Sequence, residues 1–162
     1  MKQINNFCPC RSTRSSGSNK SKNFPQKLYS ECCGIFISGQ AIPNTAEKLM
    51  RSRYTAYTQG NMDYIQATMQ GQALLDFDPE ASKDWCLSIR WQALRILESY
   101  LDKTNPDQAY VSFSALYKSE GRLYELKETS IFLKQAERWF YMGEEETKHN
   151  HCGDTSCGHH HA

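Results

Sequence analysis

The chain has 162 residues, of which 39% are hydrophobic, a size and composition that fit one modest domain with small appendages. A formal net charge of +1 gives no specific signal for nucleic-acid binding. No apolar run approaches the roughly 18 residues that span a bilayer, and the start MKQINNFCPC lacks the apolar segment of a signal peptide, so we expect no membrane contact and a cytoplasmic location.

Composition divides the chain into three predicted parts. Residues 1–40 contain two cysteine pairs and a stretch rich in serine, lysine and asparagine. Residues 41–143 contain most of the aromatic and aliphatic side chains, whereas residues 144–162 are rich in histidine and cysteine. We therefore predict a metal-binding segment, a folded middle domain and a separate tail.

The first part contains four cysteines at close spacing. Cys8 and Cys10 are separated only by Pro9, and Cys32 and Cys33 are adjacent. In a reducing compartment such grouping indicates metal binding rather than a disulfide framework. Four thiolates suit zinc, which prefers a tetrahedron of soft ligands. The spacing departs from the common Cys-x₂-Cys pattern, and the alternative is four free thiols in a disordered arm.

The middle part begins with three predicted helices. Asn44 is a good N-cap, Glu47 is placed to complete a capping box, and apolar residues then recur at helical spacing until Gly60. A second helix is expected over residues 62–69. A third is expected to follow Pro79 and to continue through residue 85.

The pattern then changes to strands. Residues 90–101 are apolar and aromatic, which predicts a strand buried on both faces, and residues 110–117 alternate as in a strand with one buried face. Further strands are expected over residues 123–133 and 137–142. Helices followed by antiparallel strands predict an α+β fold, with the helices packed on one face of a curved sheet.

The tail offers a second set of candidate metal ligands. These are His151, Cys152, Cys157 and one of the last three histidines, of which His159 comes first. Three other interpretations are a cloning remnant, a nonspecific metal sponge and a disordered tail. We interpret the tail as a native metal-binding segment on composition alone.

These pieces resemble known protein elements. The Cys8-Pro-Cys10 and Cys32-Cys33-Gly34 sequences resemble the SEC-C motif, a short zinc-binding element. Residues 46–57, AEKLMRSRYTAY, are similar to the signature of the YchJ family of small bacterial proteins, and residues 111–113, 128–132 and 138–141 fit the same family.

The resemblance implies an NTF2-like, or cystatin-like, middle domain: a cone of helices against a bent antiparallel sheet. It also implies that the four amino-terminal cysteines are zinc ligands. The chain departs from a usual SEC-C element in one respect, because residues 11–31 make the loop between the two cysteine pairs much longer.

NTF2-like domains often hold a pocket inside the cone, and six residues are candidates to line it: Arg51, Arg53, Tyr54, Tyr57, Glu128 and Trp139. The alternative for the aromatic residues is ordinary core packing. We expect Glu128 to pair with one of the two arginines and so to join a helix to the sheet, while an anion-binding arginine at the mouth of the cone is the alternative.

The sequence favours a binding role over an enzymatic one. All five histidines lie from His149 onward, so the middle domain lacks the usual near-neutral base, and no nucleophile elbow or phosphate-binding loop is visible. The leading prediction is a zinc-binding adaptor whose metal knuckle docks a protein or ribonucleoprotein partner. The alternatives are a small-molecule-binding or enzymatic NTF2-like domain with structural zinc, and a metal-handling protein that uses the tail. The sequence makes no prediction of oligomeric state.

Overall fold

The computed structural model describes residues 6–11 and 26–146. The short 3₁₀ helices are η1 (Pro9–Arg11) and η2 (Tyr29–Glu31). The α-helices are α1 (Cys33–Ile37), α2 (Ala46–Thr58), α3 (Met62–Ala67), α4 (Gly71–Leu75) and α5 (Pro79–Ser88). The strands are β1 (Arg90–Leu101), β2 (Gln108–Ser119), β3 (Arg122–Gln135) and β4 (Arg138–Glu144). Within these residues no helix has the length and apolar character required to traverse a bilayer.

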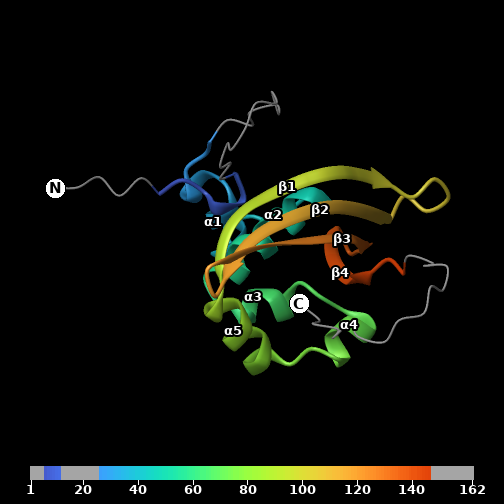
Figure 1. The fold of residues 1–162 in the computed structure, drawn as a ribbon. Helices are drawn as coiled ribbons and strands as arrows, with labels where there is room; N and C mark the ends of the chain where they lie inside the picture. Colours follow the sequence, from blue (N-terminus) through green and yellow to red (C-terminus); the bar gives the residue numbers. More distant parts are fainter. Residues whose placement is uncertain (1–5, 12–25, 147–162) are drawn as a thin grey trace, which may run out of the picture.

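The four strands form one antiparallel sheet in the order β1-β2-β3-β4. Spatial order follows chain order because each strand turns directly into the next one. The pairing of β1 with β2 shifts register between Trp91 and Ala93 and between Ile96 and Glu98, which bends the strand. Figure 1 shows α2 behind the sheet and α3, α4 and α5 below it. The predicted α+β fold with helices against a curved antiparallel sheet is confirmed.

The prediction that residues 90–101 are buried on both faces is wrong. This segment is β1, which lies at the edge of the sheet, and Leu94, at 5% exposure, is its single buried residue. Leu97 and Leu101 are more than half exposed. An apolar run cannot distinguish an edge strand from a central one, because burial depends on what packs against each face.

Helix α2 begins one residue later than predicted. Thr45 is the N-cap, and its hydroxyl accepts a hydrogen bond from the Lys48 amide at 3.2 Å. The carbonyl of Asn44, the predicted cap, instead accepts a bond from the Trp139 indole nitrogen at 3.3 Å. Glu47 does not close a capping box but forms an ion pair with Arg51 one turn further along the helix.

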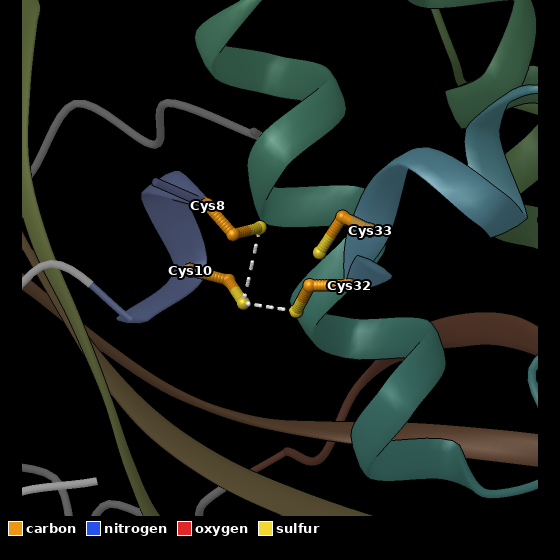
Figure 2. A group of neighbouring side chains, drawn as sticks. All are labelled: Cys8, Cys10, Cys32 and Cys33. Atoms are coloured by element: carbon orange, nitrogen blue, oxygen red, sulfur yellow. Dashed lines mark hydrogen bonds between the residues drawn. The ribbon is translucent and has the colours of Figure 1, made fainter. Parts of the chain in front are cut away.

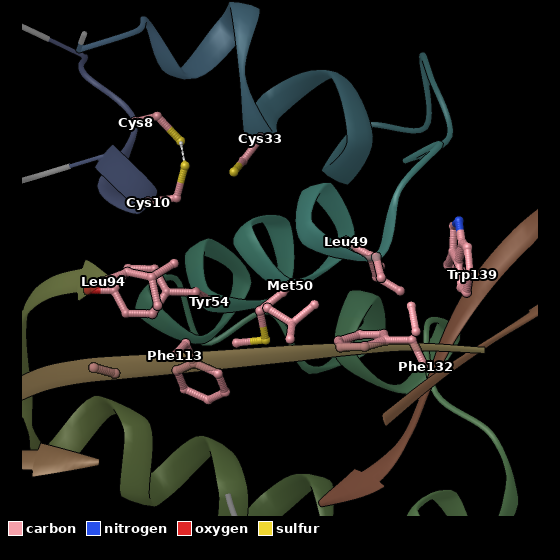
Figure 3. Packing of buried hydrophobic residues seen from close by; sticks show 14 residues of the cluster. Cys8, Cys10, Cys33, Leu49, Met50, Tyr54, Leu94, Phe113, Phe132 and Trp139 are labelled. Carbon is pink, nitrogen blue, oxygen red and sulfur yellow. Dashed lines mark hydrogen bonds between the residues drawn. The ribbon is translucent and has the colours of Figure 1, made fainter. Parts of the chain in front are cut away.

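Two groups of buried side chains fill the interior. The larger lies between α2 and the sheet and includes Leu49, Met50, Tyr54, Val111, Phe113 and Phe132 (Figure 3). The smaller joins α2, α3 and α5. Cys8, Cys10 and Cys33 belong to the larger group, so the predicted division at residue 40 is crossed by a shared core. Helices α1 and α4 were not predicted, because each is only five residues long.

Candidate metal centre

The four amino-terminal cysteines converge on one point. Their sulfur atoms all lie within 4.8 Å of one another. The sulfurs of Cys8 and Cys10 are 3.5 Å apart, and those of Cys10 and Cys32 are 3.6 Å apart (Figure 2). Four sulfurs at about 2.3 Å from a tetrahedral zinc ion would be separated by about 3.8 Å. Both the donor set and its spacing therefore fit zinc.

Backbone pairing brings the two cysteine pairs together. The Cys8 amide donates to the Lys27 carbonyl at 2.8 Å, and the Tyr29 amide donates to the Asn6 carbonyl at 2.7 Å. Phe7 and Leu28 form an antiparallel bridge between these two bonds. A short two-stranded ladder therefore joins the two ends of the long connection between the cysteine pairs. This is possible because the entropic cost of closing a loop rises only slowly with its length.

The glycine that follows the second cysteine pair has a steric role. A Cβ atom on Gly34 would lie 2.6 Å from the Tyr29 carbonyl oxygen and 3.0 Å from a carbon of its ring. Only glycine permits this close approach of α1 to η2. The Cys-Cys-Gly sequence is thereby explained by packing next to the metal ligands.

Helix α2 of the middle domain forms one wall of the cluster. The hydroxyl of Thr55 lies 3.7 Å from the Cys8 sulfur, and Thr55 is fully buried. The Arg51 guanidinium donates to the Cys10 carbonyl at 2.9 Å and pairs with Glu47 at 3.1 Å. Sequence reasoning did not identify Thr55, although its spacing of four residues from Arg51 places both on one helix face.

Electrostatics within the cluster favour one thiolate in the absence of metal. Hydrogen bonds from Cys10 and Cys33 lower the pKa of Cys8. A hydrogen bond with Cys33 lowers the pKa of Cys10, but the bond to Cys8 and burial outweigh it and raise that pKa to about 12. Hydrogen bonds to Cys10 and Cys8 raise the pKa of Cys33. A bound cation would stabilise the remaining thiolates, so metal uptake would release protons.

Arg11 adds positive charge beside the cluster. Burial alone would lower the pKa of Arg11, but a hydrogen bond to Cys32 and the nearby thiolates raise it. Its Nε atom is buried without a hydrogen-bond partner among the described residues. This cation reduces the net negative charge that four thiolates and a divalent metal would carry.

The two arginines of the signature string lie on different faces of α2. Arg53 is 2% exposed, and its guanidinium donates to the Ile65 carbonyl at 2.8 Å and to the Thr68 hydroxyl at 2.7 Å. Its Cζ atom also lies 4.5 Å from the centre of the Tyr141 ring. Arg53 therefore joins α2 to α3 and β4, whereas Arg51 faces the cysteines.

Glu128 makes hydrogen bonds to neighbouring hydroxyl groups. Burial raises the pKa of Glu128, and the nearby positive charge of Arg53 offsets part of that rise without a direct hydrogen bond. The Glu128 carboxylate accepts hydrogen bonds from Ser130 at 2.8 Å and from Tyr141 at 3.1 Å, while Arg51 pairs with Glu47. Ser130 lies two residues from Glu128 on the same face of β3, as strand alternation predicts, whereas Tyr141 comes from β4 and is placed there only by the pairing of the two strands.

The aromatic pocket candidates have packing partners. Tyr54 and Tyr57 contact the ring of Trp91, with ring centres 5.5 and 6.4 Å apart. Trp139 is buried against Asn44. Three of the six candidates, Arg53, Tyr57 and Glu128, surround Tyr141, whereas Arg51 faces the cysteines. The predicted tail ligands His151, Cys152, Cys157 and His159 lie outside the described residues.

Glu128 gives a testable pH dependence. Burial raises the pKa of Glu128 above its ordinary value of 4.5. At a pH between the ordinary pKa in the unfolded chain and the raised pKa in the folded protein, the folded state binds more protons than the unfolded state. Glu128 therefore lowers the stability of the folded state as pH rises through this range. We expect Glu128→Gln to remove this loss, so that its melting temperature relative to wild type increases from about pH 4.5 towards neutrality. The exposed Glu98→Gln serves as the control, and parallel curves for wild type and Glu128→Gln would contradict the expectation.

Comparison with known proteins gives a consistent result. A family model described as the YchJ middle NTF2-like domain matches residues 45–143. A UPF0225 protein of Haemophilus influenzae is 34% identical over 135 residues, which cover 83% of this chain and 74% of the relative. A UPF0225 protein of Geobacter sulfurreducens is 33% identical over 138 residues, which cover 85% and 78%.

Two solved structures are also similar to this chain. The solution structure of a SEC-C motif containing protein from Rhodopseudomonas palustris matches with a TM-score of 0.68 and 29% identity, covering 76% of this chain and 95% of that one. The crystal structure of a SEC-C motif containing protein from Psychrobacter arcticus matches with a TM-score of 0.68 and 25% identity, covering 91% and 84%. The NTF2-like fold with an amino-terminal cysteine knuckle is confirmed.

Proposed function

The chain belongs to the YchJ family, and from its cysteine cluster we propose that it is a zinc-binding adaptor. The observation that carries this proposal is the convergence of four sulfur atoms within 4.8 Å. Four protein ligands fill the zinc coordination sphere, so such a site holds structure and leaves no open position for a reacting water. A cytoplasmic location is part of the proposal, because reducing conditions keep the thiols available for metal.

The adaptor role is supported by the surface that the cluster holds in place. Phe7 and Leu28 are 42% and 43% exposed. As directly opposed residues of an antiparallel bridge, they project from the same face of the ladder. Lys27 adds an exposed positive charge beside them. We propose that this apolar pair contacts the protein or ribonucleoprotein partner while zinc fixes the ladder beneath it.

The experiment compares wild type with Phe7→Ser/Leu28→Ser and with Leu75→Ser, a change at an exposed leucine on α4. Each protein is purified without added metal, analysed for zinc, and used as bait with lysate of its host. We expect about one zinc per chain in all three. We expect a specific partner to be retained by wild type and Leu75→Ser but lost from Phe7→Ser/Leu28→Ser.

The possible results separate the alternatives. Metal-free wild type would contradict the zinc assignment. Equal partner retention by all three proteins would contradict docking through Phe7 and Leu28. Zinc content well above one per chain, reduced when residues 147–162 are removed, would favour the metal-handling alternative.

A further inference from the structure

The face of α2 that meets the cysteines carries two polar side chains, Arg51 and Thr55, spaced by four residues. We propose that Thr55 is a positioning residue of the metal centre, whose hydroxyl donates a hydrogen bond to the Cys8 sulfur, and that Arg51 holds the ligand loop through the Cys10 carbonyl. This inference rests on the proposed zinc-binding role. The NTF2-like domain then supplies hydrogen bonds to the residues that hold the metal.

The chemistry of the Thr55 contact fixes the direction of its hydrogen bond. The two atoms are 3.7 Å apart, and a protonated Cys8 thiol could also act as the donor. A cysteine bound to zinc is a thiolate and has no proton to donate. The buried Thr55 hydroxyl must then be the donor. The bond would orient the Cys8 sulfur and withdraw electron density from it, as hydrogen-bond donors to metal ligands do at other sites.

Arg51 acts on the same site through the backbone and through charge. It is 6% exposed, and its guanidinium bonds to the carbonyl of Cys10. Four thiolates and one zinc ion carry a net charge of −2, which is costly in a buried site without a nearby cation. Glu47 offsets only part of the Arg51 charge, because its side chain is 38% exposed to solvent.

This arrangement accounts for the residues of the signature string that helical periodicity leaves unexplained. Arg51 and Thr55 face the metal ligands, and Arg53 faces α3 and β4. Metal binding is therefore expected to stabilise α2 as well as the knuckle. The amino-terminal segment and the NTF2-like domain would respond to metal as one unit.

The test uses Thr55→Val, which keeps the shape of threonine and removes its hydroxyl, and Thr55→Ser, which keeps the hydroxyl. Thr129→Val is the control, because Thr129 shares a 2.8 Å hydroxyl hydrogen bond with Ser112 across strands β2 and β3. Full-length proteins are loaded with cobalt(II) as a spectroscopic probe. Zinc affinity is then measured by competition with a chelator, and the melting temperature is recorded with and without metal.

We expect Thr55→Val to bind zinc about 10-fold more weakly and to shift the thiolate-to-cobalt charge-transfer band to lower energy. Thr55→Ser and Thr129→Val should keep the wild-type affinity and band position. Thr55→Val with wild-type affinity and spectrum would overturn the inference. Equal losses in Thr55→Val and Thr55→Ser would also overturn it, because packing rather than the hydroxyl would be responsible. A wild-type protein that binds neither metal would instead contradict the proposed zinc role.

Discussion

Changing Cys32 and Cys33 together to serine should remove about one zinc ion per chain, because a serine hydroxyl is not ionised near neutral pH and two remaining thiolates cannot complete the tetrahedron. Stability should fall as well. Cys33 is 1% exposed and packs in the same core as Leu49 and Tyr54. Elemental analysis and thermal unfolding, each with and without chelator, measure the two effects.

The matched control is Cys86→Ala, which removes a buried cysteine from the core between α2, α3 and α5. It should lower the melting temperature through lost packing and leave the zinc content at the wild-type value. Chelator should lower the melting temperature of wild type and Cys86→Ala but not that of the double serine variant. Unchanged zinc in the serine variant would rule out these cysteines as ligands.

Replacing Arg53 with methionine should cause a large loss of stability without loss of metal. The substitution leaves the Ile65 carbonyl and the Thr68 hydroxyl without their buried donor and removes the contact with the Tyr141 ring. We expect a cost on the order of 3 kcal/mol. For a chain of this size that corresponds to a fall of about 6–12 °C in melting temperature. Zinc analysis of the folded protein should still give the wild-type value.

Arg51→Met provides the comparison on the opposite face of α2. It removes the donor to the Cys10 carbonyl and the partner of Glu47, so it should weaken zinc binding in addition to lowering the melting temperature. Circular dichroism melts and chelator competition on both variants distinguish the two roles. Equal zinc affinity in Arg51→Met and Arg53→Met would contradict the proposal that only the Arg51 face of α2 affects zinc binding.

Local patterns were sufficient for much of the fold. The period of α2, the alternation in β2 and the turn before β3 each depend on a few neighbouring residues, and the structure contains all three. The grouping of cysteines into two close pairs likewise identified the four sulfurs that the structure brings together. Such features can be predicted from sequence because the composition and hydrophobic period that determine them extend over only a short stretch of chain.

Other expectations depended on contacts between distant segments. The burial of β1 depends on its edge position, and Tyr141, one partner of Glu128, comes from β4.

The sequence by itself therefore determined the α+β order of elements and the cysteines that form the cluster. The tertiary structure alone decided that Thr55 and Arg51 face that cluster and that Arg53 faces α3. The reason is physical: helical spacing states which residues share a face, but the identity of what packs on each face is set by chain segments far away in sequence.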